Sequence, residues 1–377
     1  MKSMIYLDAN ATTPLRDSAK RALNLGMSLG GNPSSPHGVG RSIRQHLDIA
    51  RRSVSEALEG NEKDLIFTSG ATEGNRWLVE SLILLARKKG RPLKIATTPL
   101  EHPSVAKPLQ NGVASGDFVV TEIPVNLEGI WDLDAVAWAD MDVVQTTLAH
   151  NETGLIPPLK AIEGRLSGQT LWAVDASQSF ARMGPPPQRA DVVVVSGHKA
   201  GAPSGCGALL VRSLGKRLPA PWMGGGQENG LRPGTEAWLL HLSFGAVCAE
   251  MDSIRLENQS LASHRVEVES FLSEAWPTAT LLFADQPRLP NTSAVVLNGV
   301  NGEALRMAVD VSGVCVGFGA ACSALAPEPS PALIALGLSS QQARSTLRIS
   351  LPTNIEPDSL KIALEKLSGV GKRLVQR

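Results

Sequence analysis

A run of four valines at positions 192–195, followed by Ser196, Gly197, His198 and Lys199, constrains the fold more than any other feature of the sequence. A continuous β-branched run is typical of a strand buried on both faces, which occurs mainly in parallel sheets covered by helices. Six other short apolar segments alternate with stretches of helical periodicity. The predicted strands are 65–68, 94–98, 118–125, 143–148, 171–175, 191–196 and 208–212. This alternation predicts an α/β fold with a mostly parallel, seven-stranded sheet.

Helical spacing of apolar residues appears at 40–58 and 73–88, and one long helix is expected from residue 235 to about residue 258. The pattern then changes to a smaller α+β unit. Its expected elements are helices at 263–276, 302–311 and 358–375 and strands at 293–297 and 346–351. We therefore predict a large α/β domain at 15–250 and a small α+β domain made of 1–14 and 251–377.

The charge and the apolar runs narrow the class of protein. Among 377 residues, 36 Lys and Arg balance 36 Asp and Glu, without a basic block or an acidic tail. This argues against nucleic acid or a membrane as the direct partner. The apolar runs are too short to span a bilayer and the N-terminus lacks a signal-peptide pattern, so we expect a cytoplasmic protein. The four cysteines form no Cys-x-x-Cys pair, which argues against a structural zinc site and a disulfide framework.

Two charged residues follow neighbouring predicted strands. Asp175 ends the apolar segment 171–175, and Lys199 follows the valine strand. Each could be a solvated loop charge. The carboxyl ends of parallel strands are also where open α/β sheets bind ligands. Pyridoxal phosphate needs a lysine for its aldehyde and a carboxylate for its pyridine nitrogen, so this pair indicates that cofactor.

Residues 65–73 predict a strand, a glycine turn and the start of a helix, which could bind a phosphate through free backbone N–H groups. Ala71 and Thr72 would contribute there, although Thr72 could instead simply cap the helix. Ser196 and His198 are further candidate phosphate donors. His102 follows another strand beside a proline, so it could lie against a cofactor ring and act as an acid or base, or be an ordinary surface histidine.

The cysteines differ in their surroundings. Cys206, Cys248 and Cys315 have apolar neighbours and are expected to be small buried residues. Cys322 lies in a stretch of small residues with two prolines, which predicts an exposed loop. It is therefore the candidate reactive thiol, with a plain loop cysteine as the alternative.

Taken together and in order, these motifs resemble the pyridoxal-phosphate-dependent cysteine desulfurases, class V aminotransferases of fold type I. The resemblance runs almost from end to end of the chain. It covers Tyr6-Leu7-Asp8-Ala9-Asn10-Ala11-Thr12-Thr13-Pro14, residues 31–37 and 68–73, Glu101-His102, Asn151-Glu152, residues 175–178, 196–199, 225–228 and 232–235, Gly319-Ala320-Ala321-Cys322 and residues 348–351.

The resemblance implies a role for each candidate residue. Lys199 would bind the cofactor aldehyde and later move the substrate Cα proton, Asp175 would hold the pyridine nitrogen protonated, and His102 would stack on the ring and take part in proton transfer. The cofactor phosphate would be bound by Ala71, Thr72, Ser196 and His198, and across a homodimer by Thr235. Contacts near the ring hydroxyl and the substrate would come from Asn151 and Gln178. The substrate carboxylate would be bound by Asn32 and Arg348.

Cys322 matches the nucleophile of this family. It would take sulfur from L-cysteine as a persulfide, leaving L-alanine, with His102 as the candidate that helps to form its thiolate. The long segment after Cys322 resembles family members that pass sulfur to acceptor or iron–sulfur scaffold proteins, where Cys322 could also bind a cluster transiently.

Three positions depart from the family pattern, namely His150, Ser204 and the run Gly317-Phe318-Gly319-Ala320. They leave the chemical positions intact but bring the choice of sulfur acceptor into question. Two rival functions remain open. One is another enzyme of the same fold, such as a selenocysteine lyase or an aminotransferase, and the other is an inactive scaffold for sulfur-transfer partners.

Overall fold

A computed structural model describes residues 4–212, 218–319 and 328–375. A seven-stranded sheet lies at its centre, with the order β2-β8-β7-β6-β5-β3-β4. The strands are β2 Leu65–Thr68, β3 Leu93–Thr97, β4 Phe118–Glu122, β5 Val143–Thr147, β6 Leu171–Asp175, β7 Val192–Ser196 and β8 Gly207–Val211. Only β8 runs against its neighbours. The predicted mostly parallel sheet is confirmed.

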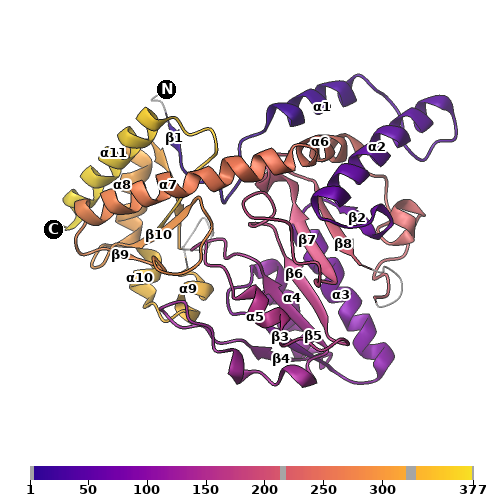
Figure 1. The fold of residues 1–377 in the computed structure, drawn as a ribbon, viewed down its shortest axis with the longest axis horizontal. Helices are drawn as coiled ribbons and strands as arrows, with labels where there is room; N and C mark the ends of the chain where they lie inside the picture. Colours follow the sequence, from indigo (N-terminus) through magenta and orange to yellow (C-terminus); the bar gives the residue numbers. More distant parts are fainter. Residues whose placement is uncertain (1–3, 213–217, 320–327, 376–377) are drawn as a thin grey trace.

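Helices cover both faces of this sheet (Figure 1). Alternate valines of β7 belong to different hydrophobic clusters, Val193 and Val195 to one and Val192 and Val194 to the other. The strand is therefore buried on both faces, as predicted. The helices of this part are α1 Asp17–Met27, α2 Gly38–Ala57, α3 Ala71–Lys89, α4 Pro103–Ala114, α5 Leu159–Glu163 and α6 Trp238–Cys248, with 3-10 turns at η1 Glu62–Asp64, η2 Leu133–Ala135, η3 Trp138–Asp140, η4 Gly197–Lys199 and η5 Gln227–Gly230.

The prediction of one helix from 235 to 258 is wrong. The helix is interrupted after α6, at Ala249 and Glu250, and a second helix, α7, runs from Met251 to Ala275. No glycine or proline marks the break. Tertiary contacts set it, because α6 packs on α1 and α2 whereas α7 continues to the smaller unit. Figure 1 shows α7 extending from one part of the molecule to the other.

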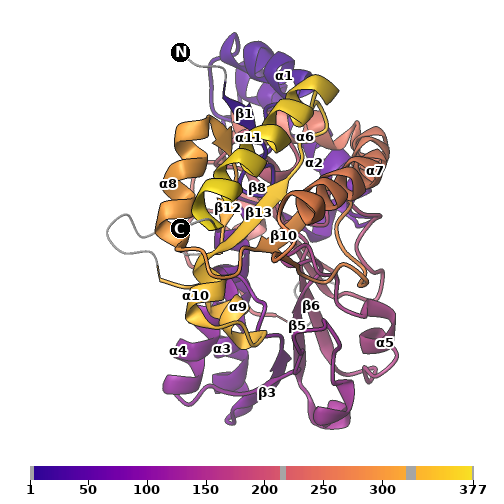
Figure 2. The same ribbon diagram turned by 90° about the vertical axis from the view of Figure 1, so that its left-hand side faces the viewer.

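The smaller unit is built around an antiparallel sheet with the order β12-β13-β10-β9. Its strands are β9 Thr280–Leu281, β10 Thr292–Val296, β12 Gly317–Phe318 and β13 Thr346–Ser350, and its helices are α8 Gly302–Ser312, α9 Pro331–Ala335, α10 Ser340–Arg344 and α11 Pro357–Val375. Helices α7, α8 and α11 gather around this sheet (Figure 2). Strand β1 (Ile5–Tyr6) pairs with β11 (Val314–Cys315), so the N-terminal segment joins the C-terminal part of the chain.

In the part of the chain that the structure describes, no helix combines the length and apolarity needed to cross a bilayer.

Candidate active site

A cavity of about 360 Å³ opens at the carboxyl ends of β5, β6 and β7. Its size is at the lower end of the usual range for small-molecule sites. It is lined by Ser69, Gly70, Ala71, Thr72, Glu73, His102, Ser104, Thr147, Ala149, Asn151, Asp175, Ser177, Gln178, Ser196, His198, Lys199, Ser204 and Gly205. The fold thus brings together nine of the residues named above from sequence, contributed by segments from Ala71 to Lys199.

The start of α3 forms one end of the cavity. Gly70 precedes the helix with φ +151°, a conformation that favours glycine, and no side chain caps the first turn. The interpretation of Thr72 as the helix cap is therefore wrong, because Thr72 already lies inside the helix. Ser196 and His198 line the same cavity as this helix start, whose uncapped N–H groups are suited to binding an anion.

His198 lies half-buried at this end. Burial, together with the nearby charges of Lys199 and Arg182, lowers its pKa to about 4. Its Nδ1 lies 3.2 Å from the Thr12 hydroxyl. His198 is therefore neutral at physiological pH and can offer a hydrogen bond, but no charge, to an anion.

Asp175 lies at the end of β6 and is 5% exposed. Its Oδ1 accepts a hydrogen bond from the Ser177 amide (2.9 Å), and its Oδ2 accepts one from Asn75 Nδ2 (2.8 Å). These donors fix the orientation of a carboxylate beside the cavity.

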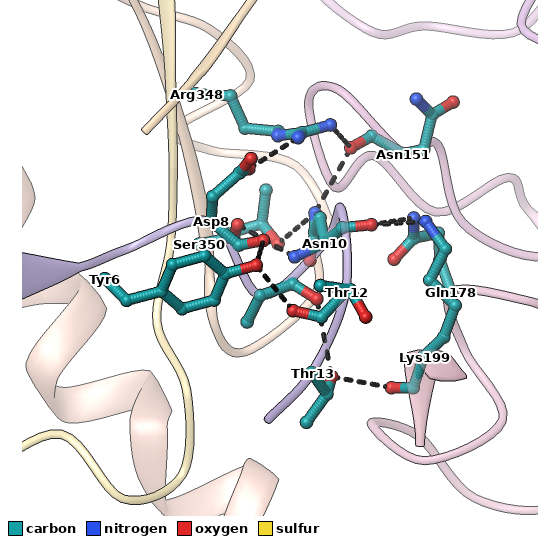
Figure 3. Close-up of polar contacts among 12 residues, drawn as sticks. Tyr6, Asp8, Asn10, Thr12, Thr13, Asn151, Gln178, Lys199, Arg348 and Ser350 are labelled. Atoms are coloured by element: carbon teal, nitrogen blue, oxygen red, sulfur yellow. Dashed lines mark hydrogen bonds and ion pairs between the residues drawn. The ribbon is translucent and has the colours of Figure 1, made fainter. Parts of the chain in front are cut away.

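Lys199 lies in the 3-10 turn directly after β7, and its Nζ donates to the Asn10 carbonyl. The Thr13 hydroxyl donates to the Lys199 carbonyl (2.8 Å) (Figure 3). Burial, followed by the charges of Arg182 and Arg348, lowers the pKa of Lys199 to about 7. Near neutral pH a large fraction of this amine is uncharged, as a nucleophilic lysine requires.

His102 caps the first turn of α4. Its Nδ1 accepts the Ser104 amide hydrogen (3.1 Å) and lies 2.8 Å from the Ser104 hydroxyl. Although His102 is exposed by surface area, the loss of water around its ring is the largest cause that lowers its pKa, while Asp175 raises it and Lys199 lowers it further. The predicted proline-flanked turn is the start of a helix, with His102 anchored through one ring nitrogen.

Glu101, next to His102, is a buried acid that the sequence analysis did not single out as chemical. Its Oε1 accepts hydrogen bonds from the Thr147 amide (2.6 Å) and the Thr98 hydroxyl (3.1 Å). Burial and the nearby charge of Asp175 raise its pKa to about 8. The contact ties the loop that carries His102 to the end of β5.

The N-terminal segment contacts two residues that line the cavity, Gln178 and Asn151 (Figure 3). Gln178 Nε2 donates to the Asn10 carbonyl (3.0 Å), and Asn10 Nδ2 donates to the Asn151 carbonyl (3.2 Å). Arg348 donates to the same Asn151 carbonyl (3.0 Å) and forms an ion pair with Asp8 at 2.6 Å. Arg348 does not line the cavity itself but contacts a residue that does.

Besides Arg348, the predicted site residues Asn32 and Thr235 do not line the cavity. Asn32 is exposed and its Oδ1 accepts the Ser34 amide hydrogen, while Thr235 is exposed on the segment before α6. Cys322 lies outside the described residues. Cys206 and Cys248 are buried as predicted, and burial raises the pKa of the Cys206 thiol to about 12. Cys315 is half-buried rather than buried; among the described residues its strand β11 forms a two-stranded sheet with β1.

The departures from the family pattern also have places in the structure. His150 is buried, with its Nδ1 2.9 Å from the Thr153 hydroxyl, and burial lowers its pKa to about 3, so it is a neutral part of a turn. Ser204 lines the cavity beside Gly205. Ser204 therefore borders the candidate site itself.

Sequence reasoning missed Asn10, Asn75, Ser104 and Arg182. Asn10 acts largely through its backbone carbonyl, which carries no sequence signal, and its contact with Lys199 spans 189 positions. Asn75 does have a signal. It is a polar residue on the buried face of α3, where a core side chain is expected.

The residues present fit pyridoxal phosphate. A lysine amine and an oriented aspartate border one cavity, and an uncapped helix start lies at its other end. The buried Ser177 hydroxyl lines the same cavity and has no hydrogen-bond partner within residues 4–212, 218–319 and 328–375. Buried polar groups are almost always satisfied, so this hydroxyl indicates a polar ligand.

The chain is similar to known proteins in sequence and in fold. The family model Aminotransferase class-V matches residues 5–361. Cysteine desulfurase IscS 1 of Archaeoglobus fulgidus is 31% identical over 98% of this chain and 98% of its own. A NifS-like protein of solved structure has a TM-score of 0.89 at 26% identity, covering 98% of this chain and 100% of that one. The solved structure of SspA in complex with cysteine has a TM-score of 0.79 at 25% identity, over 93% of this chain and 99% of SspA.

The chain therefore belongs to the class V aminotransferases, with the fold type I architecture. Within that family it is a cysteine desulfurase, and pyridoxal phosphate is its cofactor. The resemblance drawn from the sequence is confirmed.

Proposed function

We propose that this enzyme takes sulfur from L-cysteine in the cavity beside Lys199, releases L-alanine and receives the sulfur on Cys322 as a persulfide. The convergence of Lys199, Asp175 and His102 on one cavity is the observation that carries the proposal. The bound cysteine in the SspA structure supports the choice of substrate.

When bound, pyridoxal phosphate supplies an electron sink for charge that develops at the substrate Cα. Asp175 keeps the pyridine nitrogen protonated, and Ala71, Thr72, Ser196 and His198 hold the phosphate. Lys199 binds the cofactor aldehyde and then moves the Cα proton, for which its depressed pKa of about 7 is suited. Gln178 and Asn151 orient the ring hydroxyl and the substrate.

The substrate carboxylate is assigned to Arg348 and Asn32. A guanidinium fork is suited to a carboxylate because it can donate two parallel hydrogen bonds. The support for Arg348 is that it donates to the carbonyl of Asn151, which borders the cavity.

The sulfur step is a displacement at the substrate sulfur. The Cys322 thiolate attacks that sulfur, a new S–S bond forms, and the Cβ–S bond breaks with its electron pair left on the substrate carbon. Protonation of that carbon and of the adjacent Cα gives alanine. The persulfide is then passed to an acceptor, which we propose to be an iron–sulfur scaffold or a thiolation protein. A reducing compartment such as the cytoplasm keeps the required thiols free.

We further propose a homodimer in which Thr235 reaches the phosphate of the partner's site. The support is that Thr235 is exposed and lies outside the cavity of its own chain. Arg232, three residues earlier, forms an ion pair at 2.7 Å with Glu73, which lines that cavity. The segment before α6 is thereby held near the mouth of the site.

The test is a comparison of variants supplied with L-cysteine and a reductant. Wild type should release sulfide and alanine in equal amounts. Cys322→Ala should keep the visible cofactor band and lose sulfide release, and Lys199→Ala should lose both the band and the turnover. Unchanged sulfide release from Cys322→Ala would refute the persulfide step. A protein without the band and without turnover would instead support the inactive scaffold, and a strong preference for selenocysteine would support the lyase.

A further inference from the structure

A chain of hydrogen bonds beside the cavity joins Asp175 to His102 through Asn75 and Ser104. Asn75 lies on α3 and is 1% exposed. Its Nδ2 donates both to Asp175 Oδ2 (2.8 Å) and to the Ser104 hydroxyl (2.9 Å). Ser104 in turn contacts His102 Nδ1 through its hydroxyl (2.8 Å) and its amide (3.1 Å).

Close packing of α3 on the sheet makes this reach possible. Gly74 precedes Asn75, and a Cβ at Gly74 would lie 2.9 Å from Val194 Cγ1. Only glycine leaves room for the helix at this height above β7. Asn75 therefore lies close enough to donate to a carboxylate on the neighbouring strand β6.

Two contacts fix the direction of the hydrogen bonds in this chain, namely that of Asn75 with the Asp175 carboxylate and that of the Ser104 amide with His102 Nδ1. A carboxylate only accepts hydrogen bonds, so the Asn75 amide nitrogen must face Asp175, and its second hydrogen goes to the Ser104 oxygen. The Ser104 hydroxyl then has its own hydrogen left for His102 Nδ1. The Ser104 amide also donates to that nitrogen, so Nδ1 carries a lone pair and the ring proton lies on Nε2.

We propose that Asn75 and Ser104 are positioning residues that link Asp175 to His102 and hold His102 as the neutral tautomer protonated on Nε2. The proposal deepens the proposed function, since it rests on His102 and Asp175 acting there on the ring. In this form His102 stabilises an anion through its Nε2–H and cannot take up a proton at that nitrogen. Its help to a thiolate such as that of Cys322 is then a donated hydrogen bond.

The surrounding charges agree with a neutral ring. His102 is faced by Asp175 from β6, by Lys199 from the turn after β7 and by His150 from the segment after β5. Burial is the largest cause that lowers its pKa, ahead of the opposing charge of Asp175. Protonation at Nδ1 would also have to displace two donors from Ser104.

The tautomer can be measured by nitrogen NMR of the holoenzyme labelled at histidine, with the His102 signals assigned by their loss in His102→Gln. We expect a Nδ1 shift typical of an unprotonated nitrogen and a Nε2 shift typical of a protonated one near neutral pH. In Ser104→Ala and Asn75→Ala the His102 pKa should rise toward the ordinary value of about 6.5. Both variants should lower kcat with little change in KM for cysteine.

Two further variants separate positioning from simple packing. Ser104→Thr keeps the hydroxyl and should keep the wild-type tautomer and kcat. Ser115→Ala removes a serine hydroxyl at the other end of α4, bonded to Asp117, and should leave both unchanged. A protonated Nδ1 in wild type, or Ser104→Ala and Asn75→Ala with wild-type shifts and titration, would overturn the proposal. The NMR result does not depend on turnover, so it stands apart from any failure of the proposed desulfurase chemistry.

Discussion

At the scale of single residues, the site works by placing ionisable groups where burial changes their protonation. Lys199, His102 and His198 all have lowered pKa values, with burial as the largest cause in each case. The neutral forms of these groups are the ones that the chemistry needs. Burial beside the cavity therefore provides an uncharged amine and uncharged imidazoles near neutral pH.

The lowered pKa of Lys199 predicts how the apoprotein takes up its cofactor. Only the neutral amine attacks the aldehyde, so the rate of uptake should rise with pH through a midpoint of about 7. Stopped-flow absorbance of the visible band measures this rate. A midpoint near the value of a free lysine, about 10.4, would contradict the assignment of a buried amine.

The raised pKa of Glu101 predicts that the stability of the folded protein depends on pH. Because its pKa is raised from 4.5 to about 8 in the folded protein, its contribution to stability is full below 4.5 and is lost as pH rises through about 8. Glu101→Gln keeps an acceptor for Thr147 but does not ionise. The free energy of unfolding of Glu101→Gln minus that of wild type should therefore increase by more than about 1 kcal/mol as the pH is raised from acidic to alkaline. Denaturant unfolding across that range would disprove this if the difference between the two proteins stayed constant.

At the scale of elements, the sequence predicted strands better than their connections. The seven strands were placed within about three residues because each short apolar run stands out between stretches of helical periodicity. Strand β4 ends at Glu122 instead of 125, since Pro124 has no N–H for the ladder. The break between α6 and α7 had no local signal, and it depends on packing partners that a single sequence does not reveal.

The approach of α3 to the sheet gives a prediction at this scale. In Gly74→Ala the added Cβ meets Val194 and pushes the helix outward, which should cost about 1–3 kcal/mol of stability. The same shift should weaken cofactor binding, because the anion-binding end of the cavity is the start of α3. Thermal unfolding and cofactor titration measure the two effects.

Gly369→Ala is the matched control, since a Cβ at this glycine in α11 meets nothing within 4 Å. It should be neutral or slightly stabilising in the helix. An equal loss of stability in both variants would show that contact of the added Cβ at position 74 with Val194 does not destabilise the protein.

At the scale of the whole molecule, both ends of the chain contact residues that line the active-site cavity. One hydrophobic cluster includes Ile254 and earlier residues, and another joins Ile5 and Leu7 to residues from Leu261 onward. We propose on this basis that 15–250 form the large domain and 1–14 with 251–377 the small one. The segment from Asp8 to Thr13 then links the small domain to Lys199, a long-range connection that no local pattern could predict.

The proposed homodimer predicts that two chains with different active-site substitutions complement each other in a hybrid dimer. In a hybrid of Thr235→Ala with Lys199→Ala, the Thr235→Ala chain keeps its own lysine and receives an intact threonine from its partner. That hybrid should therefore contain one undamaged site, and its activity should exceed that of either parent. Tagged co-purification followed by a sulfide assay measures it. Hybrid activity no higher than the mean of the two parents would contradict sharing of Thr235 between subunits.

The central claim is that sulfur passes from L-cysteine to Cys322 in a cavity built around Lys199, Asp175 and His102. The most direct test is a single turnover with sulfur-labelled L-cysteine in the absence of reductant, followed by mass spectrometry of the peptides. We predict one additional sulfur on the peptide that contains Cys322 and an equal amount of alanine. Alanine formed with the label absent from that peptide would contradict the account.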